Sequence, residues 1–153
     1  MPCGKKLLIK DNVLKKFNAY KQLKKKDKEA GGILVGQILI ETGNYVIDNV
    51  TTPMAQDKRT RHRFSRKSQG HQEYYNYLFH KNDRRYFYLG EWHTHPERIP
   101  SPSFTDKRNW HRISNFGFEN EYLFFIILGT IELKVWSINK SNHKIVLLDR
   151  ERK

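Results

Sequence analysis

The chain has 153 residues, a length that can bury one core but leaves little for a second, so we expect a single domain over residues 1–153. Hydrophobic residues make up 37% of the chain and aromatic residues 13%, which excludes a disordered chain although 29% of the residues are charged. The excess of 29 Lys and Arg over 16 Asp and Glu favours acidic partners but specifies no chemistry.

The apolar segments are too short for a membrane span or for export. The longest, residues 122–128, is far below the roughly 20 residues that cross a bilayer. The run at residues 7–9 is also too short for a signal peptide. The single cysteine, Cys3, excludes an internal disulfide and a zinc ribbon. We therefore expect a cytoplasmic protein with no membrane partner.

The first half of the chain is predicted to hold one helix, a strand pair and a long loop. Apolar residues recur at helical spacing over residues 11–26, which predicts an amphipathic surface helix. Segments 31–40 and 44–52 are rich in β-branched residues around a short turn signal, and this pattern predicts a β-hairpin. Residues 53–70 are polar, basic and without periodicity, which is typical of a long surface loop.

The second half is predicted to hold two helices and four strands. Aromatic spacing over residues 71–80 indicates a helix, residues 86–95 a strand, and Ser103 is a good N-cap for a third helix. The apolar face of this third helix would contain Phe104, Trp110 and Ile113. Further strands are expected at residues 122–128, 131–138 and 144–148. This order of elements predicts an α+β fold in which a mixed β-sheet is flanked by helices.

Two histidines on the strand at residues 86–95 have metal-ligand spacing. Residues two apart on a strand point to the same face, so His93 and His95 would present their imidazoles side by side. A catalytic zinc site needs a third protein ligand, and Asp106 at the start of the next helix is the best candidate. Two simpler interpretations stay open: a metal-free surface histidine pair, and an Asp106 that only caps its helix together with Ser103.

These residues belong to a longer pattern. Glu29 opens the segment Glu29-Ala30-Gly31-Gly32-Ile33-Leu34-Val35-Gly36, and His93-Thr94-His95-Pro96 and Ser103-Phe104-Thr105-Asp106 follow later in the chain. The pattern resembles the zinc motif of the JAB/MPN metalloprotease family, in which a distant Glu precedes His-x-His-Pro, a spacer and Ser-x-x-Asp. The resemblance runs from about residue 7 to residue 148 and implies the JAB/MPN fold, which is cytidine-deaminase-like.

The resemblance also implies a mechanism. One Zn²⁺ per chain would be held by His93, His95 and Asp106. Glu29 would accept a proton from the attacking water and pass it to the leaving amine, and Ser103 would donate a hydrogen bond to the developing oxyanion. Glu91 is a rival for the base, because it lies on the same face of the strand as both histidines. Otherwise it would support the metal by accepting the second N–H of an imidazole.

A finer resemblance is to the small prokaryotic JAB proteins of CBASS anti-phage operons. It rests on residues 88–97 and 100–103, together with the upstream residues Arg61, Phe64, Arg66, His71 and Gln72. Those relatives remove a conjugated protein by cutting after the C-terminal residue of a CD-NTase. The resemblance thus implies a deubiquitinase-type isopeptidase or peptidase in antiviral defence. Its partner would be a CD-NTase-like or ubiquitin-like protein conjugated through its C-terminus.

The basic residues of segment 53–70 support a second interpretation. They could form a rim that holds nucleic acid or an acidic protein surface, which would make the chain a non-catalytic binding module on the same scaffold. The residues of this rim are Arg59, Arg61, Arg63, Arg66 and Lys67. The other five histidines, at positions 62, 71, 80, 111 and 143, lack paired spacing and are expected to be surface or hydrogen-bonded residues. A zinc deaminase is excluded, because its Pro-Cys-x-x-Cys ligands need two cysteines.

Overall fold

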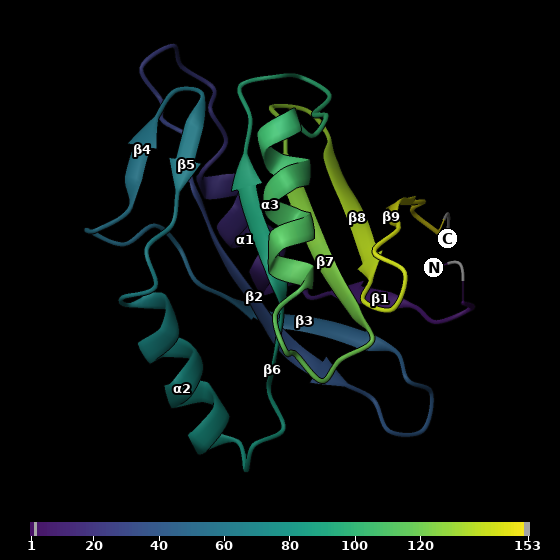
Figure 1. Cartoon of the computed structure of the whole chain (residues 1–153). Coiled ribbons are helices and arrows are strands. Elements are labelled where there is room, and N and C mark those ends of the chain that lie inside the picture. The colour runs from purple at the N-terminus through teal and green to yellow at the C-terminus, as the bar shows by residue number, and fades with distance from the viewer. Residues whose placement is uncertain (2, 152–153) are drawn as a thin grey trace.

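The computed structural model describes Met1 and residues 3–151, and it shows a curled mixed sheet with helices on both faces (Figure 1). In this part of the chain the main sheet has seven strands in the order β1-β3-β2-β6-β7-β8-β9. The strands are β1 (Leu7–Ile9), β2 (Gly31–Ile38), β3 (Tyr45–Val50), β6 (Phe87–Thr94), β7 (Tyr122–Leu128), β8 (Leu133–Asn139) and β9 (Ile145–Leu148). The pairs β1–β3 and β6–β7 are parallel, and the other neighbours are antiparallel. The predicted α+β class is confirmed.

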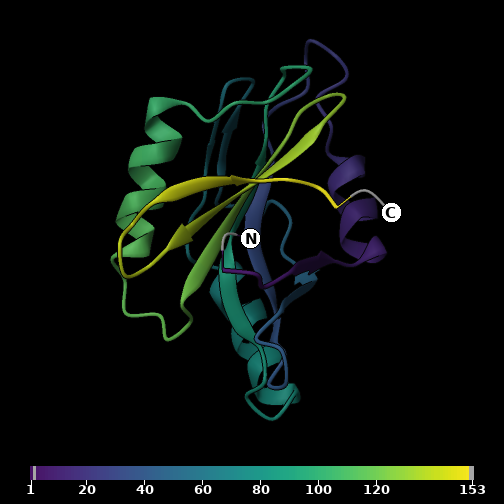
Figure 2. The ribbon, with the colours of Figure 1, turned by 90° about the vertical axis from the view of Figure 1, so that its right-hand side faces the viewer.

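Helix α1 (Asp11–Ala19) covers one face of the sheet, while α2 (His71–Lys81) and α3 (Phe104–Ser114) lie on the other (Figures 1 and 2). Val13 and Phe17 of α1 are one helical turn apart and are both fully buried. They belong to one core cluster with Trp92 of β6, whereas Trp110 of α3 packs in a second cluster with Phe125 of β7. Strand β7 is buried along its whole length, which explains its unbroken apolar sequence.

The first helix is shorter than predicted, since it ends at Ala19 instead of continuing to residue 26. The buried Gln22 donates its side-chain amide to the carbonyls of Asp27 and Arg61. The Asp27 carboxylate in turn accepts the backbone N–H of Lys24 at 2.8 Å. These contacts hold the segment after α1 in a turn, so the lysine run at residues 24–26 is not the end of a helix.

Segment 53–70 contains a second, two-stranded sheet, so its prediction as an unpatterned loop was wrong. Strands β4 (Lys58–Thr60) and β5 (Arg63–Ser65) pair in antiparallel fashion. With three residues each, they are too short to show a recognisable alternation of apolar and polar residues. Strand β1 was missed for the same reason, and it is stabilised by pairing with β3.

Helix α3 begins after Ser103 as predicted, and Trp110 and Ile113 are buried. Phe104 is 80% exposed, so its assignment to the apolar face was wrong. At about 100° per residue, Phe104 points roughly 120° away from Trp110 and to the side opposite Ile113. No helix within the described residues has the length and apolar character that crossing a membrane requires.

A β-bulge in β6 sets which side chains share the face covered by α2 and α3. Successive residues of β2 oppose Gly90 and Tyr88, so Leu89 is an extra residue in the ladder. An extra residue changes the alternation of the side chains that follow it. Tyr88 and Glu91 are three positions apart, yet they lie on one face, and the Tyr88 hydroxyl donates to the Glu91 carboxylate at 3.1 Å.

We expect Gly90→Ala to destabilise the protein. Gly90 has a φ of +133°, and a Cβ atom at this position would lie 1.7 Å from the carbonyl oxygen of Phe124 in β7. Backbone strain and overpacking together should lower the free energy of unfolding by about 3 kcal/mol or more in urea titrations. The control is Gly117→Ala, whose Cβ would meet no heavy atom within 4 Å and whose stability should change by at most about 1 kcal/mol. Equal losses for both variants would contradict this account of the bulge.

Candidate metal centre

Three potential metal ligands converge where the end of β6 meets the start of α3. His93 lies in β6, His95 directly follows that strand, and Asp106 lies in the first turn of α3. Each of them offers a ligand atom, and the three atoms lie within 4.8 Å of one another. The fold thus brings together the three residues that the sequence singles out.

The spacing of these atoms fits a tetrahedral ion. The Nε2 atoms of His93 and His95 are 3.0 Å apart. The two carboxylate oxygens of Asp106 lie one beside each imidazole, Oδ1 at 3.3 Å from His93 Nε2 and Oδ2 at 3.3 Å from His95 Nε2. Ligands placed at about 2.0–2.1 Å from a tetrahedral zinc ion are separated by about 3.3–3.4 Å. Two imidazoles and one carboxylate are also a donor set that catalytic zinc sites use. These residues therefore fit zinc in both distance and chemistry.

A capping box orients the carboxylate of Asp106. The Ser103 hydroxyl oxygen accepts the N–H of Asp106 at 3.0 Å, and the Ser103 N–H donates to Asp106 Oδ2 at 2.7 Å. The same carboxylate lies beside both imidazoles, because a carboxylate has several lone pairs. Asp106 is therefore a helix cap and can be a metal ligand at the same time.

The charges of these three groups are coupled. Burial alone would raise the pKa of Asp106, but hydrogen bonds from the His93 and His95 side chains outweigh it and hold that pKa well below its usual range. Burial would likewise lower the pKa of His95, yet its hydrogen bond with Asp106 raises it above the usual value. A metal ion must displace these imidazole protons, so protons and metal compete for the site.

Glu29 lies two residues before the start of β2 and is only 5% exposed. It comes close to the histidines because β2 and β6 pair with Gly31 opposite His93. Burial raises the pKa of Glu29 to about 7, although the charges of His93 and His95 oppose this rise. A carboxyl group with such a pKa can accept and release a proton near neutral pH.

Strands β4 and β5 hold the backbone of Glu29 in place. The Glu29 N–H donates to the Thr60 carbonyl at 2.8 Å, and Arg59 Nε donates to the Glu29 carbonyl at 2.7 Å. The ring of Phe64 covers Gly31, where a Cβ atom would lie 2.5 Å from it. The sequence analysis missed these supports, because strands of three residues show no alternation of apolar and polar residues that could have signalled them.

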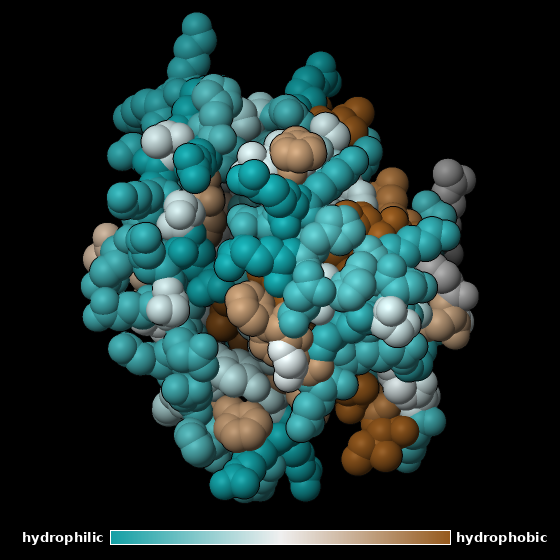
Figure 3. Space-filling view, viewed as in Figure 1, coloured by the Kyte–Doolittle hydropathy of each residue, from teal (hydrophilic) through white to brown (hydrophobic). Residues whose placement is uncertain are grey.

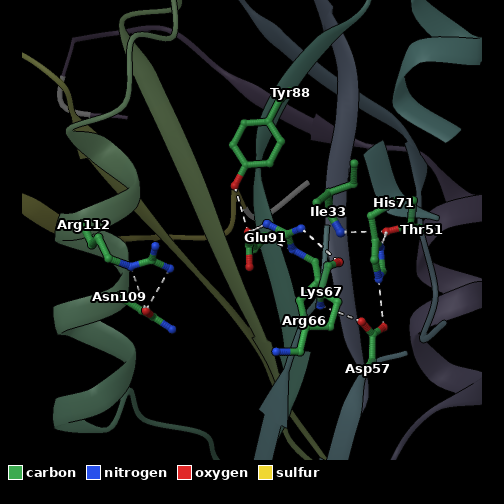
Figure 4. Close-up of polar contacts among 10 residues, drawn as sticks. All are labelled: Ile33, Thr51, Asp57, Arg66, Lys67, His71, Tyr88, Glu91, Asn109 and Arg112. Carbon is green, nitrogen blue, oxygen red and sulfur yellow. Dashed lines mark hydrogen bonds and ion pairs between the residues drawn. The ribbon is translucent and has the colours of Figure 1, made fainter. Parts of the chain in front are cut away.

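Glu91 has different partners from those expected. Arg66 and Tyr88 both donate to its Oε1 atom (Figure 4). Within the described residues, no hydrogen bond or ion pair joins Glu91 to His93 or His95. The carboxylate beside the second ring nitrogen of His95 is Glu97, at 3.7 Å, which the sequence analysis did not select.

The predicted basic rim is partly used inside the protein. Arg59 donates to the carbonyls of Lys28 and Glu29, and Arg61 donates to those of Lys24 and Lys25. Arg66 pairs with Glu91. Three of the five cationic groups thus hold the fold together, which weakens the case for a nucleic-acid-binding module.

The histidines outside the ligand set are not brought to the site. His71 is fully buried, where its ring nitrogens contact Thr51 Oγ1 at 2.5 Å and Asp57 Oδ2 at 2.8 Å. The Nδ1 atom of His143 contacts the hydroxyl of Ser114. The other three, His62, His80 and His111, are exposed.

The family described as prokaryotic homologs of the JAB domain matches residues 13–139 of the chain. The chain belongs to this family. Two solved structures share its JAB-type fold. A solution structure from Desulfitobacterium hafniense has a TM-score of 0.64 at 21% identity, covering 94% of this chain and 90% of its own. A solution structure from Salinibacter ruber has a TM-score of 0.51 at 14% identity, and the match covers 95% of this chain and 91% of that structure.

The JAB chain is also similar to proteins named CD-NTase/cGAS isopeptidase. It is 38% identical over 105 residues to one from Escherichia coli, in a match that covers 68% of this chain and 65% of the relative. For Vibrio cholerae the identity is 36% over 107 residues, covering 69% and 67%. For Pseudomonas aeruginosa it is 37% over 103 residues, covering 67% and 64%. The chain thus spans about two thirds of the length of the curated relatives it matches.

We expect the JAB protein to bind about one zinc ion per chain. Metal analysis of protein purified without chelator should show that His95→Ala loses this zinc, while His111→Ala, which alters an exposed histidine outside the ligand set, keeps it. Because the pKa of His95 lies above 6.5, zinc affinity should already fall as the pH is lowered from 8 to 6.5. Equal zinc contents in the two variants would show that the site is misassigned.

The buried carboxyl group of Glu29 should destabilise the metal-free JAB protein at high pH. Its pKa is about 7 in the fold against an ordinary value of 4.5, so its favourable contribution is complete below about pH 4.5 and is lost as the pH rises through 7. In urea titrations with chelator, Glu29→Gln should therefore raise stability more at pH 8 than at pH 5. Glu41→Gln, at an exposed turn position, should show no such difference. A Glu29→Gln effect that is the same at both pH values would contradict the shift.

Proposed function

We propose that the chain is a zinc-dependent isopeptidase of bacterial antiviral defence, which hydrolyses the amide bond between the C-terminal tail of a CD-NTase and a conjugated protein. The observation that carries the proposal is the convergence of His93, His95 and Asp106 on one point, beside the buried Glu29. The substrate class is supported by the relatives named CD-NTase/cGAS isopeptidase.

The residues divide the chemistry among them. His93, His95 and Asp106 would hold the zinc ion, which when bound acidifies water and polarises a carbonyl group. Glu29 would accept a proton from the attacking water at its carboxylate and deliver it to the amine nitrogen as the C–N bond breaks. The oxygen of Ser103 accepts a hydrogen bond from Asp106, so its O–H remains available to donate to the developing oxyanion.

The depth of the site supports a bond in an extended tail. The side chains of His93, His95 and Asp106 are only 14%, 10% and 17% exposed. A peptide bond in an extended segment has free space around it, so it approaches such partly covered groups more easily than a bond within a folded surface does. The C-terminal tail of a folded protein is a substrate of the required shape.

Glu29→Gln should abolish cleavage while zinc stays bound, because it removes the proton acceptor and leaves the three ligands unchanged. We expect the single-turnover rate to fall by about 10² or more. The substrate is a CD-NTase whose C-terminal tail is joined by an amide bond to a reporter protein. Glu41→Gln is the matched control and should cleave at the wild-type rate. A chelator should stop cleavage by wild type and by Glu41→Gln. Cleavage that survives the chelator, or a Glu29→Gln variant of near wild-type rate, would count against the mechanism.

A further inference from the structure

Glu91 lies on the floor of the face that α2 and α3 flank. Figure 4 shows Glu91 between Arg66 and the side of α3 that carries Asn109 and Arg112. The space-filling view from the side of Figure 1 is hollowed between α2 and α3 (Figure 3). The side chains of Glu91 and Arg66 are 21% and 25% exposed, as expected for groups on the floor of such a hollow. His93 follows two residues later on the same strand.

Only one of the two carboxylate oxygens of Glu91 is used by the protein. Its Oε1 atom accepts hydrogen bonds from Arg66 Nε at 3.1 Å, from Arg66 Nη2 at 2.5 Å and from the Tyr88 hydroxyl at 3.1 Å. Its Oε2 atom has no partner among Met1 and residues 3–151. No buried side-chain oxygen in that part of the chain lacks a partner, so Oε2 is open to solvent. Glu91 is thus a fixed carboxylate that offers one acceptor to the hollow.

The surrounding charges define which donor this acceptor suits. The ion pair with Arg66 already neutralises the carboxylate. Arg112 lies on the side of α3 that faces Glu91, and Lys67 lies beside Arg66 (Figure 4). A cationic side chain of the substrate would be repelled by these groups, whereas a neutral N–H would not. The acceptor therefore fits a neutral donor, and the main-chain N–H groups of an extended tail are neutral donors that a substrate tail of almost any sequence supplies.

The strand register indicates which side of the scissile bond lies over Glu91. Gly31 is opposite His93 and Ile33 is opposite Glu91, so Glu29 lies beyond His93 in the other direction. Under the proposed function Glu29 protonates the leaving amine, which places the amine at the Glu29 end. The acyl tail then extends toward Glu91, which is about 7 Å along the strand from His93, or two residues of extended chain.

We propose that Glu91 is a substrate-binding residue whose Oε2 accepts a hydrogen bond from a main-chain N–H of the acyl tail, about two residues before the scissile carbonyl. This assignment deepens the proposed function and rests on it. It gives Glu91 a role separate from both proton transfer and metal binding. The bulge at Leu89 brings Tyr88 to the same face, and the contacts with Tyr88 and Arg66 hold this carboxylate in one orientation.

The experiment combines changes in the enzyme and in the substrate. The CD-NTase–reporter substrate is made by ligation, with a single N-methyl amide at the second, third or fourth peptide N–H before the scissile bond. Wild type, Glu91→Ala and the control Glu41→Ala are compared on each substrate by kcat/KM, together with their zinc content. Glu91→Gln, which keeps the side-chain shape and a weaker acceptor, is included in case the alanine variant does not fold.

We expect one N-methyl position to lower the kcat/KM of wild type and of Glu41→Ala by about 10- to 100-fold, the effect of losing a hydrogen bond to a charged acceptor. For Glu91→Ala, methylation at that position should lower kcat/KM by less than about 3-fold relative to the unmethylated substrate, because the hydrogen bond is already absent. The loss for Glu91→Gln should lie between those of wild type and Glu91→Ala. All variants should keep their zinc. If the effects of Glu91→Ala and of N-methylation on kcat/KM are additive at every position, or if Glu91→Ala loses its zinc, the assignment is overturned while the isopeptidase proposal stays intact. Failure of wild type to cleave the unmethylated substrate would instead overturn the proposed function, and this subsite with it.

Discussion

The antiparallel register between β2 and β6 is the constraint on which the site depends. It places Gly31 opposite His93 and so brings Glu29 beside imidazoles that lie more than 60 residues later in the chain. The register needs a residue without a side chain at position 31, because a Cβ atom there would lie 2.5 Å from both the Trp92 carbonyl oxygen and the Phe64 ring. A slip of one residue would turn the side chains of one strand to the opposite face of the sheet and separate Glu29 from the two imidazoles.

The electrostatics of the site follow from the burial that this packing imposes. A buried carboxyl group favours its neutral form, and this is why the pKa of Glu29 rises to about 7. Asp106 is also substantially buried, yet two imidazoles and a capping N–H surround its carboxylate and keep it ionised. Two carboxyl groups in one site thus have opposite protonation behaviour, which suits one of them to proton transfer and the other to holding a cation.

Most of the cationic excess near the site is part of its construction. Arg59 fixes the backbone of Glu29, Arg61 holds the turn after α1, and Arg66 holds the carboxylate of Glu91. Arginine suits these positions because its planar guanidinium group offers several donors in fixed directions. A net charge of +13 is therefore only weak support for nucleic-acid binding. It is partly the means by which a short hairpin is attached beside the candidate metal centre.

The sequence by itself determined the elements and the candidate ligands that depend on local periodicity. The extended segments 31–40 and 86–95, and the pairing of His93 with His95 on one face, follow from the two-residue repeat of a strand. The position of Asp106 follows from helix capping. Each of these features is set by backbone geometry within a few residues, so a single chain segment contains the information.

Only the tertiary structure decided the features that depend on contacts between distant segments. These are the end of α1, the hairpin of β4 and β5, the pKa of Glu29 and the partners of Glu91. A three-residue strand has no period to detect, and a pKa depends on how much water the fold removes. Glu91 lies on the strand face of His93 as expected, but the bulge at Leu89 and the approach of Arg66 gave it other partners. Local sequence fixes the direction of a side chain, whereas its neighbours are fixed by the packing of the whole chain.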